Sequence, residues 1–408
     1  MSFLAAAMAI LVLAGLVQAV CGYVAVRRFR GGLRDAAPIG QAPGGPWPAV
    51  TVLKPLCGDE PLLEAALASV CAQDYPAFQL VLGVQHAADP ALAVVARLQA
   101  RFPGCDIAVV VDPRPHGCNR KISNLINMFS AARHDVMVIA DSDVHCPPDY
   151  LRRMVSALSV PGTGLATVVY GGVAPGRAGG SLAGALGAST LNHHFLPGAL
   201  MARWLGRQDC LGASMALTRE TLAAAGGLAA LADHLADDHV LGRLVRGLGL
   251  QVRVADTLVT TTVPETSLRA LFRHELRWCR TVLSVEPLGF ALSSVQYPLA
   301  WAGLAVLLSG GAGWAGMLFL IAWAVRAGAA LGVDRCLACD KTMLATPVSI
   351  WLLPLRDLMS VITMLASYCG DRVEWRGQVM HTGGAASAPG SRSSSPHHVP
   401  ASRESIAS

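Results

Sequence analysis

The sequence is poor in charged side chains, which make up 14% of its 408 residues, and rich in hydrophobic ones, which make up 53%. Soluble domains carry about a quarter charged residues, so an ordinary soluble protein is excluded and an integral membrane protein is predicted. The net charge of +5 is a small excess. It is compatible with a protein that lies near anionic lipid, and we expect no nucleic-acid partner.

No charged residue occurs between Ser2 and Val26, and crossing a hydrocarbon core takes about 20 residues. Positive charge is also missing in front of this run, whereas a secretory signal would carry it there. Four arginines follow the run, from Arg27 to Arg34. We therefore predict a retained anchor over residues 1–26, with its C-terminal side in the cytoplasm, rather than a cleaved signal.

A second charge-free run extends from Pro287 to Val325. It is long enough for two crossings joined at a glycine-rich turn near residues 310–313. We predict two transmembrane helices over residues 287–333.

Residues 343–370 contain two shorter apolar halves on either side of Arg356 and Asp357. They form either one transmembrane helix interrupted by polar residues or a re-entrant or interfacial pair, and the sequence does not decide between these. The Ser-, Pro- and Gly-rich tail over residues 383–408 is predicted to be disordered.

The eleven cysteines are scattered along the chain. Because the middle of the chain is assigned to the cytoplasm, thiols rather than disulfides are expected. Cys336 and Cys339 form an isolated CxxC, and a zinc site would need two more ligands that the neighbouring sequence lacks. We therefore predict no zinc site.

Between the apolar segments, residues 46–286 alternate strand and helix patterns. The predicted strands are 49–56, 78–85, 107–112 and 136–140, and the predicted helices are 61–73, opened by Pro61, then 89–102 and 121–132. Strands that alternate with helices of about 10–15 residues imply parallel pairing with both faces covered. The predicted fold class is α/β, a Rossmann-like, mostly parallel sheet in which ligands bind beyond the carboxyl ends of the strands.

Polar side chains gather at these predicted strand ends. Asp141 and Asp143 follow the buried strand 136–140. The other polar residues at strand ends are Asp59, Glu60, Gln85 and Asp112. Paired carboxylates can hold Mg²⁺ or Mn²⁺ together with the oxygens of a substrate diphosphate. A solvated loop is the alternative, and the other converging strand ends favour the cation site.

Two further clusters lie later in the chain. Asp237 and Asp238 begin a predicted helix. An acidic residue at this place can simply complement the helix dipole, and this alternative to a functional role explains one aspartate but does not require two. Residues 272–280, FRHELRWCR, place Trp278 among arginines just ahead of the second apolar run. Positive charge flanking a membrane segment explains the arginines but not the tryptophan.

Four motifs, KPLCGDE, DSD, LADDH and HELRW, follow one another between the N-terminal anchor and the C-terminal apolar block. Together with PLLEAALASVCAQDYP, VQHAADPAL and CNRKISNLIN, they resemble the membrane GT-A glycosyltransferases. More narrowly, they resemble the ceramide glucosyltransferase family and its bacterial branch, the hopanoid-biosynthesis glycosyltransferases. The resemblance covers about residues 49–377. It implies a GT-A fold and the inverting transfer of a sugar from a UDP-sugar to the hydroxyl of a membrane lipid.

The resemblance also implies roles for individual residues and a divalent cation, Mg²⁺ or Mn²⁺, as cofactor. The candidates for nucleotide-sugar binding are Glu60, Asp59, Gln85, Lys121 and Asp141, and those for the metal are Asp143 and Asp141. The candidates for catalysis are Asp238 as general base, Arg277 and Trp278, and those for the acceptor are His193, His194 and Trp278. His274 stands in the first place of the family's (Q/R)-x-x-R-W motif, a departure that leaves its role open.

The chain looks closer to the hopanoid branch, which implies UDP-N-acetylglucosamine as donor and a bacteriohopanetetrol-type acceptor in a bacterial inner membrane. Transfer from UDP-glucose to ceramide is the alternative. A polysaccharide synthase is less expected, because His274 departs from its motif and only about three or four crossings are available to build a pore. A non-catalytic membrane binding protein is the last alternative.

Overall fold

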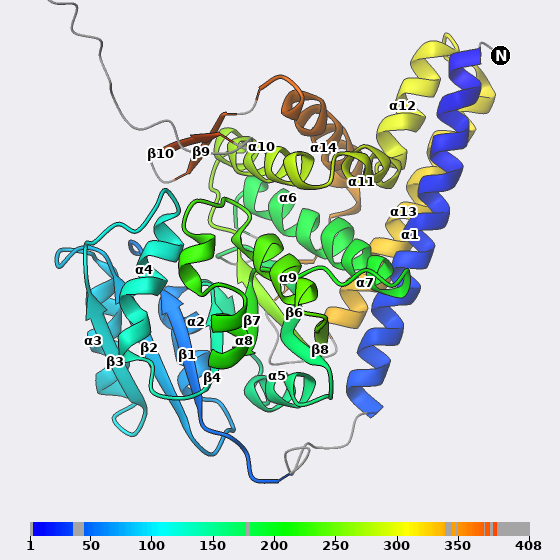
Figure 1. Cartoon of the computed structure of the whole chain (residues 1–408). Coiled ribbons are helices and arrows are strands. Elements are labelled where there is room, and N and C mark those ends of the chain that lie inside the picture. Colours follow the sequence, from blue (N-terminus) through cyan, green and yellow to red (C-terminus); the bar gives the residue numbers. More distant parts are fainter. Residues whose placement is uncertain are drawn as a thin grey trace, which may run out of the picture.

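The structure is a computed structural model that describes residues 3–35, 45–176, 180–338, 345–347, 349–370, 372–375 and 378–381. The predicted disordered tail and Cys339 lie outside these residues. The chain folds into an eight-stranded sheet flanked by helices, and long apolar helices stand along one side of that domain (Figure 1).

The first half of the sheet is parallel, as predicted. It contains β1 (Val50–Pro55), β2 (Phe78–Val84), β3 (Asp106–Val111) and β4 (Val136–Ala140) in the order β3-β2-β1-β4. Val52 lies between Leu80 of β2 and Val138 of β4 in this register. The carboxyl ends of β1, β2 and β4 therefore meet at one edge.

The second half of the sheet is mixed. It adds β7 (Ser214–Thr218), β6 (Thr163–Val173), β8 (Gln251–Thr262) and the short β5 (Val144–His145), in that order after β4. β7 is antiparallel to both β4 and β6, β8 is parallel to β6, and β5 is antiparallel to β8. The fold is therefore the predicted α/β class with a mostly parallel sheet.

Helices cover both faces of the sheet because successive strand residues point to opposite sides. One face packs on α2 (Leu63–Cys71), α3 (Ala91–Arg101) and α5 (Tyr150–Leu158). The other packs on α4 (Arg120–Met128), α8 (Arg219–Ala224) and α9 (Asp237–Gly247), with short 3₁₀ turns at Phe129–Ala131 (η1) and Leu228–Leu231 (η4). Val52 faces the first core and Leu53 faces the second.

Two helix starts illustrate the local chemistry. The side chain of Asn119 caps α4 by accepting a hydrogen bond from the Ile122 amide at 3.1 Å, as short polar side chains commonly do. The predicted start of α2 at Pro61 is wrong, because the helix begins at Leu63. Leu62 has a left-handed backbone with φ of 62°, so the α-helix can begin only after this residue.

The apolar helices lie mostly outside the sheet domain. They are α1 (Phe3–Asp35), α11 (Pro287–Leu292), α12 (Pro298–Leu308), α13 (Gly313–Ala338) and α14 (Leu353–Ser367), with 3₁₀ turns at Ser293–Gln296 (η5) and Ile350–Leu352 (η6). Within the described residues, three helices are long and apolar enough to cross a membrane, or up to four if α11 with η5 and α12, bent by 72°, count as one span. The chain therefore has the helices of a membrane protein.

A further group of helices joins the two parts. It consists of α6 (Leu182–Thr190), a π-helical turn at Leu191–Phe195 (η3), α7 (Leu196–Trp204) and the amphipathic α10 (Leu268–Val285). The small pair β9 (Arg372–Trp375) and β10 (Gln378–His381) follows α14. Figure 1 shows α6 and α7 between the sheet and the long helices α1 and α13, with α10 alongside α6 and next to α14.

Candidate functional site

A cavity of about 1680 Å³ lies at the carboxyl ends of β1, β2 and β4 and extends beneath α10 as far as α1. The predicted site residues that line it are Glu60, Gln85, Lys121, Asp141, Asp143, Asp238, Arg277 and Trp278. Asp59 is exposed and is not among the lining residues. Asp112 also lies outside the lining and pairs with Arg114 at 2.6 Å. The structure thus brings together residues that are up to about 220 positions apart in the chain.

Asp141 and Asp143 enter this cavity directly after β4. The carboxylate of Asp143 accepts a hydrogen bond from the hydroxyl of Thr261 on β8. Burial, and next the negative charge of Asp141, raise the pKa of Asp143 to about 6. The pair is therefore a concentration of negative charge that a cation would stabilise.

Basic side chains hold the loop that carries these aspartates. Lys121, in the first turn of α4, places its Nζ 2.7 Å from Asp141 Oδ1 and 3.5 Å from Asp237 Oδ2. Burial alone would lower the pKa of Lys121, but the charges of Asp141 and Asp237 outweigh it and raise that pKa. Lys121 therefore stays charged and links the two acidic clusters.

Lys54 also holds the loop that carries Asp141 and Asp143. It is fully buried within β1, and its Nζ donates to the carbonyl oxygens of Asp141 at 2.9 Å and Val144 at 3.1 Å. Burial lowers the pKa of Lys54. On the cavity side, the hydroxyl of Ser142 donates to the carboxylate of Glu60. Glu60 is thereby fixed beside the aspartate pair.

The second acidic cluster lies at the start of α9, as predicted. The loop before α9 is tied to the start of α4, because Asn119 Nδ2 donates to the His234 carbonyl at 2.8 Å. Asp238 accepts a hydrogen bond from the His239 amide at 2.7 Å. Burial, and next the charge of Asp237, raise the pKa of Asp238 to about 6.

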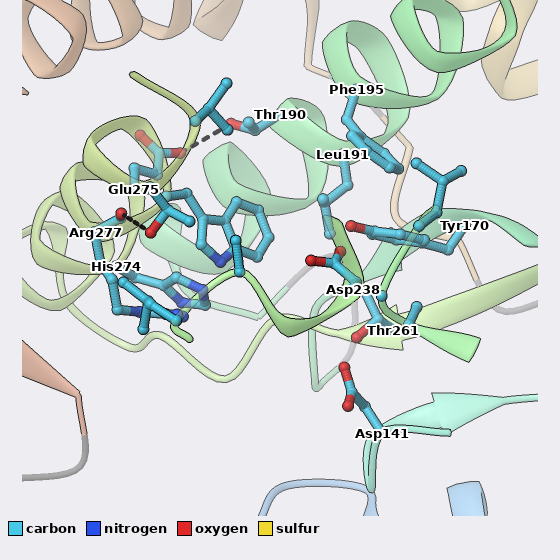
Figure 2. Close-up of a pocket in the computed structure, with 18 of the residues that line it drawn as sticks. Asp141, Tyr170, Thr190, Leu191, Phe195, Asp238, Thr261, His274, Glu275 and Arg277 are labelled. Carbon is cyan, nitrogen blue, oxygen red and sulfur yellow. Dashed lines mark hydrogen bonds between the residues drawn. The ribbon is translucent and has the colours of Figure 1, made fainter. Parts of the chain in front are cut away.

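Gly212 lies against the Asp238 carboxylate. A Cβ at this position would come within 2.6 Å of Asp238 Oδ2, well inside van der Waals contact. Only glycine therefore leaves room for the observed carboxylate position. Figure 2 shows Asp238 and Asp141 in the same space, with Tyr170 beside Asp238 and Thr261 between the two aspartates.

α10 supplies the opposite wall of the cavity, and Figure 2 shows His274, Glu275 and Arg277 there. His274 is hydrogen-bonded through Nδ1 to Glu265 and meets the ring of Trp278 edge-on at 4.6 Å between centroids. The ring of His274 thus packs directly against Trp278.

The neighbouring Glu275 anchors α10 to two other helices. It is buried and pairs with the fully buried Arg356 of α14 through two contacts of 2.7 and 2.8 Å. The Thr190 hydroxyl of α6 donates to the same carboxylate at 2.9 Å. Three helices, α10, α14 and α6, are thus held together at the cavity wall.

The two candidate acceptor histidines do not line this cavity. His193 lies 2.8 Å from Asp334 of α13, and His194 lies 3.2 Å from Asp357 of α14. Both line a separate small cavity, of about 30 Å³, between α1, α7 and α13. In this structure they join the apolar helices to η3.

Sequence reasoning missed several residues of the site, among them Lys54, Tyr170 and Thr261. Lys54 could have been noticed as a lysine within an otherwise apolar strand. Tyr170 and Thr261 line the cavity from the C-terminal part of β6 and the end of β8. Nothing in the surrounding sequence distinguishes them, because only the pairing of β6 with β8 brings them to Asp238 and Asp143.

The carboxylates of the cavity fit a divalent cation whose remaining coordination positions are filled by a bound ligand. The described residues contain no group of three or more His, Cys, Asp or Glu placed to hold a metal. Mg²⁺ typically uses only one or two carboxylates together with phosphate oxygens and water. Asp143 and Asp141, with the raised pKa of Asp143, are suited to such a site.

Known proteins resemble this chain in sequence and in fold. Residues 7–387 match the profile of glycosyl transferase family 21. The chain is 35% identical over 114 residues to a ceramide glucosyltransferase of Komagataella phaffii, which covers 27% of this chain and 22% of that protein. It is 23% identical over 240 residues to ceramide glucosyltransferase 1 of Caenorhabditis elegans, which covers 59% of this chain and 51% of that protein. The matches thus span about half or less of these relatives' length.

One solved structure covers nearly the whole chain. The mannosyltransferase PcManGT from Pyrobaculum calidifontis, in complex with GDP-Man and Mn²⁺, matches with a TM-score of 0.50 and 20% identity, over 89% of this chain and 99% of that one. A likeness at this identity concerns the fold alone. It confirms the predicted GT-A fold.

Proposed function

The chain belongs to glycosyl transferase family 21, and from this premise we propose that it transfers a sugar from a UDP-sugar to the hydroxyl of a membrane lipid, with inversion. One observation carries the proposal. Asp141, Asp143 and Asp238, from distant segments, line a single cavity that also contains Arg277 and reaches the apolar helices. Such a cavity can take a charged donor at one end and a lipid headgroup at the other.

Asp238 is the proposed general base. In an inverting displacement, the acceptor hydroxyl attacks the sugar from the side opposite the leaving diphosphate and loses its proton to a nearby carboxylate. A pKa of about 6 leaves Asp238 mostly ionised at neutral pH and makes it a stronger base than an ordinary aspartate. The His239 amide donates to Oδ1 of Asp238, and Oδ2 lies on the side of Gly212, which lines the cavity.

The donor diphosphate is proposed to lie over the aspartate pair. Asp143 and Asp141 would hold a divalent cation, which neutralises charge on the leaving diphosphate when bound. Arg277 lies on the opposite wall and supplies further positive charge to the leaving group. Glu60 and Gln85 line the same end of the cavity, as expected for contacts on the uridine side.

The acceptor is proposed to come from the membrane. The cavity lining continues from Asp238 past Trp278 to Leu292, next to η5, and to Gln18 on α1. Trp278 offers a flat apolar surface with one hydrogen-bond donor, which suits an amphipathic headgroup. We propose a bacterial inner membrane, and we place the sheet domain on its cytoplasmic side because of the arginines after the first apolar run.

The comparisons support the ceramide alternative better than the hopanoid acceptor, since the curated relatives above are ceramide glucosyltransferases. We therefore propose UDP-glucose and a ceramide-type lipid as the first pair to test. UDP-N-acetylglucosamine with a bacteriohopanetetrol-type lipid is the second pair.

The test is product analysis by mass spectrometry. Membranes from a host without its own glycolipid enzymes are incubated with each donor–acceptor pair, using the native chain, Asp238→Asn, and Asp256→Asn as a matched control at an exposed position of β8. We expect a monoglycosylated lipid from the native chain and the control, and none from Asp238→Asn. A long polymer, or equal product from Asp238→Asn, would contradict the proposal.

A further inference from the structure

An exposed apolar stripe runs along α14 and the turn before it. Trp351 is 71% exposed and Leu365 is 60% exposed, and Leu355, Leu358 and Ile362 are exposed between them. Their spacing of three and four residues puts all five side chains on one face of a helix. By length and composition, residues 350–367 could cross a membrane. A transmembrane helix and a helix lying in the membrane surface would both expose such a stripe.

Contacts before α14 attach it to the sheet domain. The Thr346 amide donates to the Gly172 carbonyl of β6 at 3.3 Å, and the Ala174 amide donates to the Thr346 hydroxyl at 2.8 Å. Asn192 of η3 donates to the Thr346 carbonyl at 3.3 Å. The chain therefore enters α14 from the side of the sheet.

Contacts after α14 return the chain to the same side. β9 packs against α10, and a Cβ at Gly370 would lie 3.4 Å from the Arg280 guanidinium of α10. α10 itself lines the cavity through Arg277, opposite Asp238. A helix that crossed the bilayer would place its ends on opposite sides of a core about 30 Å thick, whereas both ends of α14 contact one body.

The opposite face of α14 is held by buried polar contacts. Arg356 pairs with Glu275 of α10, and Asp357 accepts a hydrogen bond from the Leu299 amide at the start of α12. Next to them, Leu353 packs with Leu299 and Val12 in the core between α1, α12 and α13. At its start, the exposed stripe touches the membrane helices, because the ring of Trp351 meets that of Trp323 of α13 edge-on at 4.9 Å between centroids. This contact makes lipid the expected neighbour of the stripe.

We propose that α14 does not cross the membrane but lies along its surface, on the side of the sheet domain, with the stripe from Trp351 to Leu365 inserted at the boundary between headgroups and acyl chains. The partner is the lipid surface itself. The two ends of α14 and the following β9 are then on the same side as the cavity, and α14 separates the lipid from α10. This inference rests on contacts of α14 and does not depend on the proposed reaction.

The first test measures depth with brominated lipids that quench tryptophan fluorescence. The fluorescence of Trp351 is obtained by subtracting the signal of the Trp351→Phe variant from that of the native chain. The fluorescence of a tryptophan at position 362 is obtained by subtracting the signal of Trp351→Phe from that of the double variant that carries both Trp351→Phe and Ile362→Trp. A surface helix predicts the same ratio of shallow to deep quenching at both positions. A transmembrane helix puts residue 362 about 16 Å deeper than residue 351, and that result would overturn the proposal. Absence of quenching at both would also overturn it, since a second copy or another protein would then cover the stripe.

The second test uses a membrane-impermeant maleimide on sealed vesicles of each orientation, with labelled peptides resolved by mass spectrometry. Native Cys369 is exposed after α14, native Cys57 is exposed in the sheet domain, and Ser349→Cys adds a thiol at an exposed position before α14. All three are expected to label from the same side. Labelling of positions 349 and 369 from opposite sides would refute the proposal.

Discussion

Lowering the pH from 7 to 5 is expected to reduce kcat/KM about tenfold if Asp238 is the general base. Its pKa of about 6 leaves roughly nine tenths of the carboxyl ionised at pH 7 and roughly one tenth at pH 5. The base acts only as the carboxylate, so activity is complete above this pKa and is lost as the pH falls through it. Protonation of Asp143, whose pKa is also about 6, would steepen the loss wherever the cation is not saturating.

The assay is the initial rate of sugar transfer from a labelled UDP-sugar in detergent, at fixed acceptor fraction, between pH 5 and 8. It is repeated at saturating and limiting Mn²⁺ to separate the two aspartates. Asp237→Asn is the matched variant, because Asp237 is the main charge that raises the pKa of Asp238. Its acid limb should move to lower pH. An unmoved limb in this variant, or an equal rate at pH 5 and 7 in the native chain, would refute the reasoning.

Three other outcomes are expected. Gly212→Ala should reduce kcat at least about tenfold, because its Cβ would displace the Asp238 carboxylate and proton transfer depends on geometry. Gly247→Ala is the control and should leave kcat unchanged, because its Cβ meets open space. Equal rates in the two variants would contradict this prediction. Arg356→Met should cost about 3–5 kcal/mol of stability, because it leaves Glu275 buried without a counter-charge, and this loss is measured as a lower Tm in detergent. The double variant Arg356→Met with Glu275→Leu should recover most of the lost stability. An unchanged Tm in the single variant would argue against a buried pair. EDTA should abolish transfer, and Mn²⁺ or Mg²⁺ should restore it; full activity in EDTA would rule out the proposed cation.

Elements with a purely local cause could be predicted from the sequence. β4 has its predicted bounds, Val136–Ala140, because five apolar residues between Asp135 and Asp141 suit a strand buried on both faces. α9 begins at Asp237 as expected, since acidic residues favour the first turn of a helix. The carboxyl ends of parallel strands share an edge, and this explains why Glu60, Gln85 and Asp141 were found together.

Features with a distant cause could not be predicted. The place of β7 beside β4, antiparallel to it, depends on strand pairing that a short apolar segment does not encode. Lys54 binds carbonyl oxygens about 90 residues further along the chain. The same limit applies to His194, whose partner Asp357 lies 163 positions away on α14. This contact could not be predicted, because it depends on how the apolar helices pack.

The extension of the cavity from Asp238 to Gln18 of α1 has a kinetic consequence under the proposed function. A glycolipid formed there can leave by lateral diffusion with its tails still in the leaflet, and no pore has to carry it. Turnover should then follow the mole fraction of acceptor within the membrane rather than its bulk concentration. Diluting the acceptor with inert lipid would slow the enzyme even when the total amount of acceptor is unchanged.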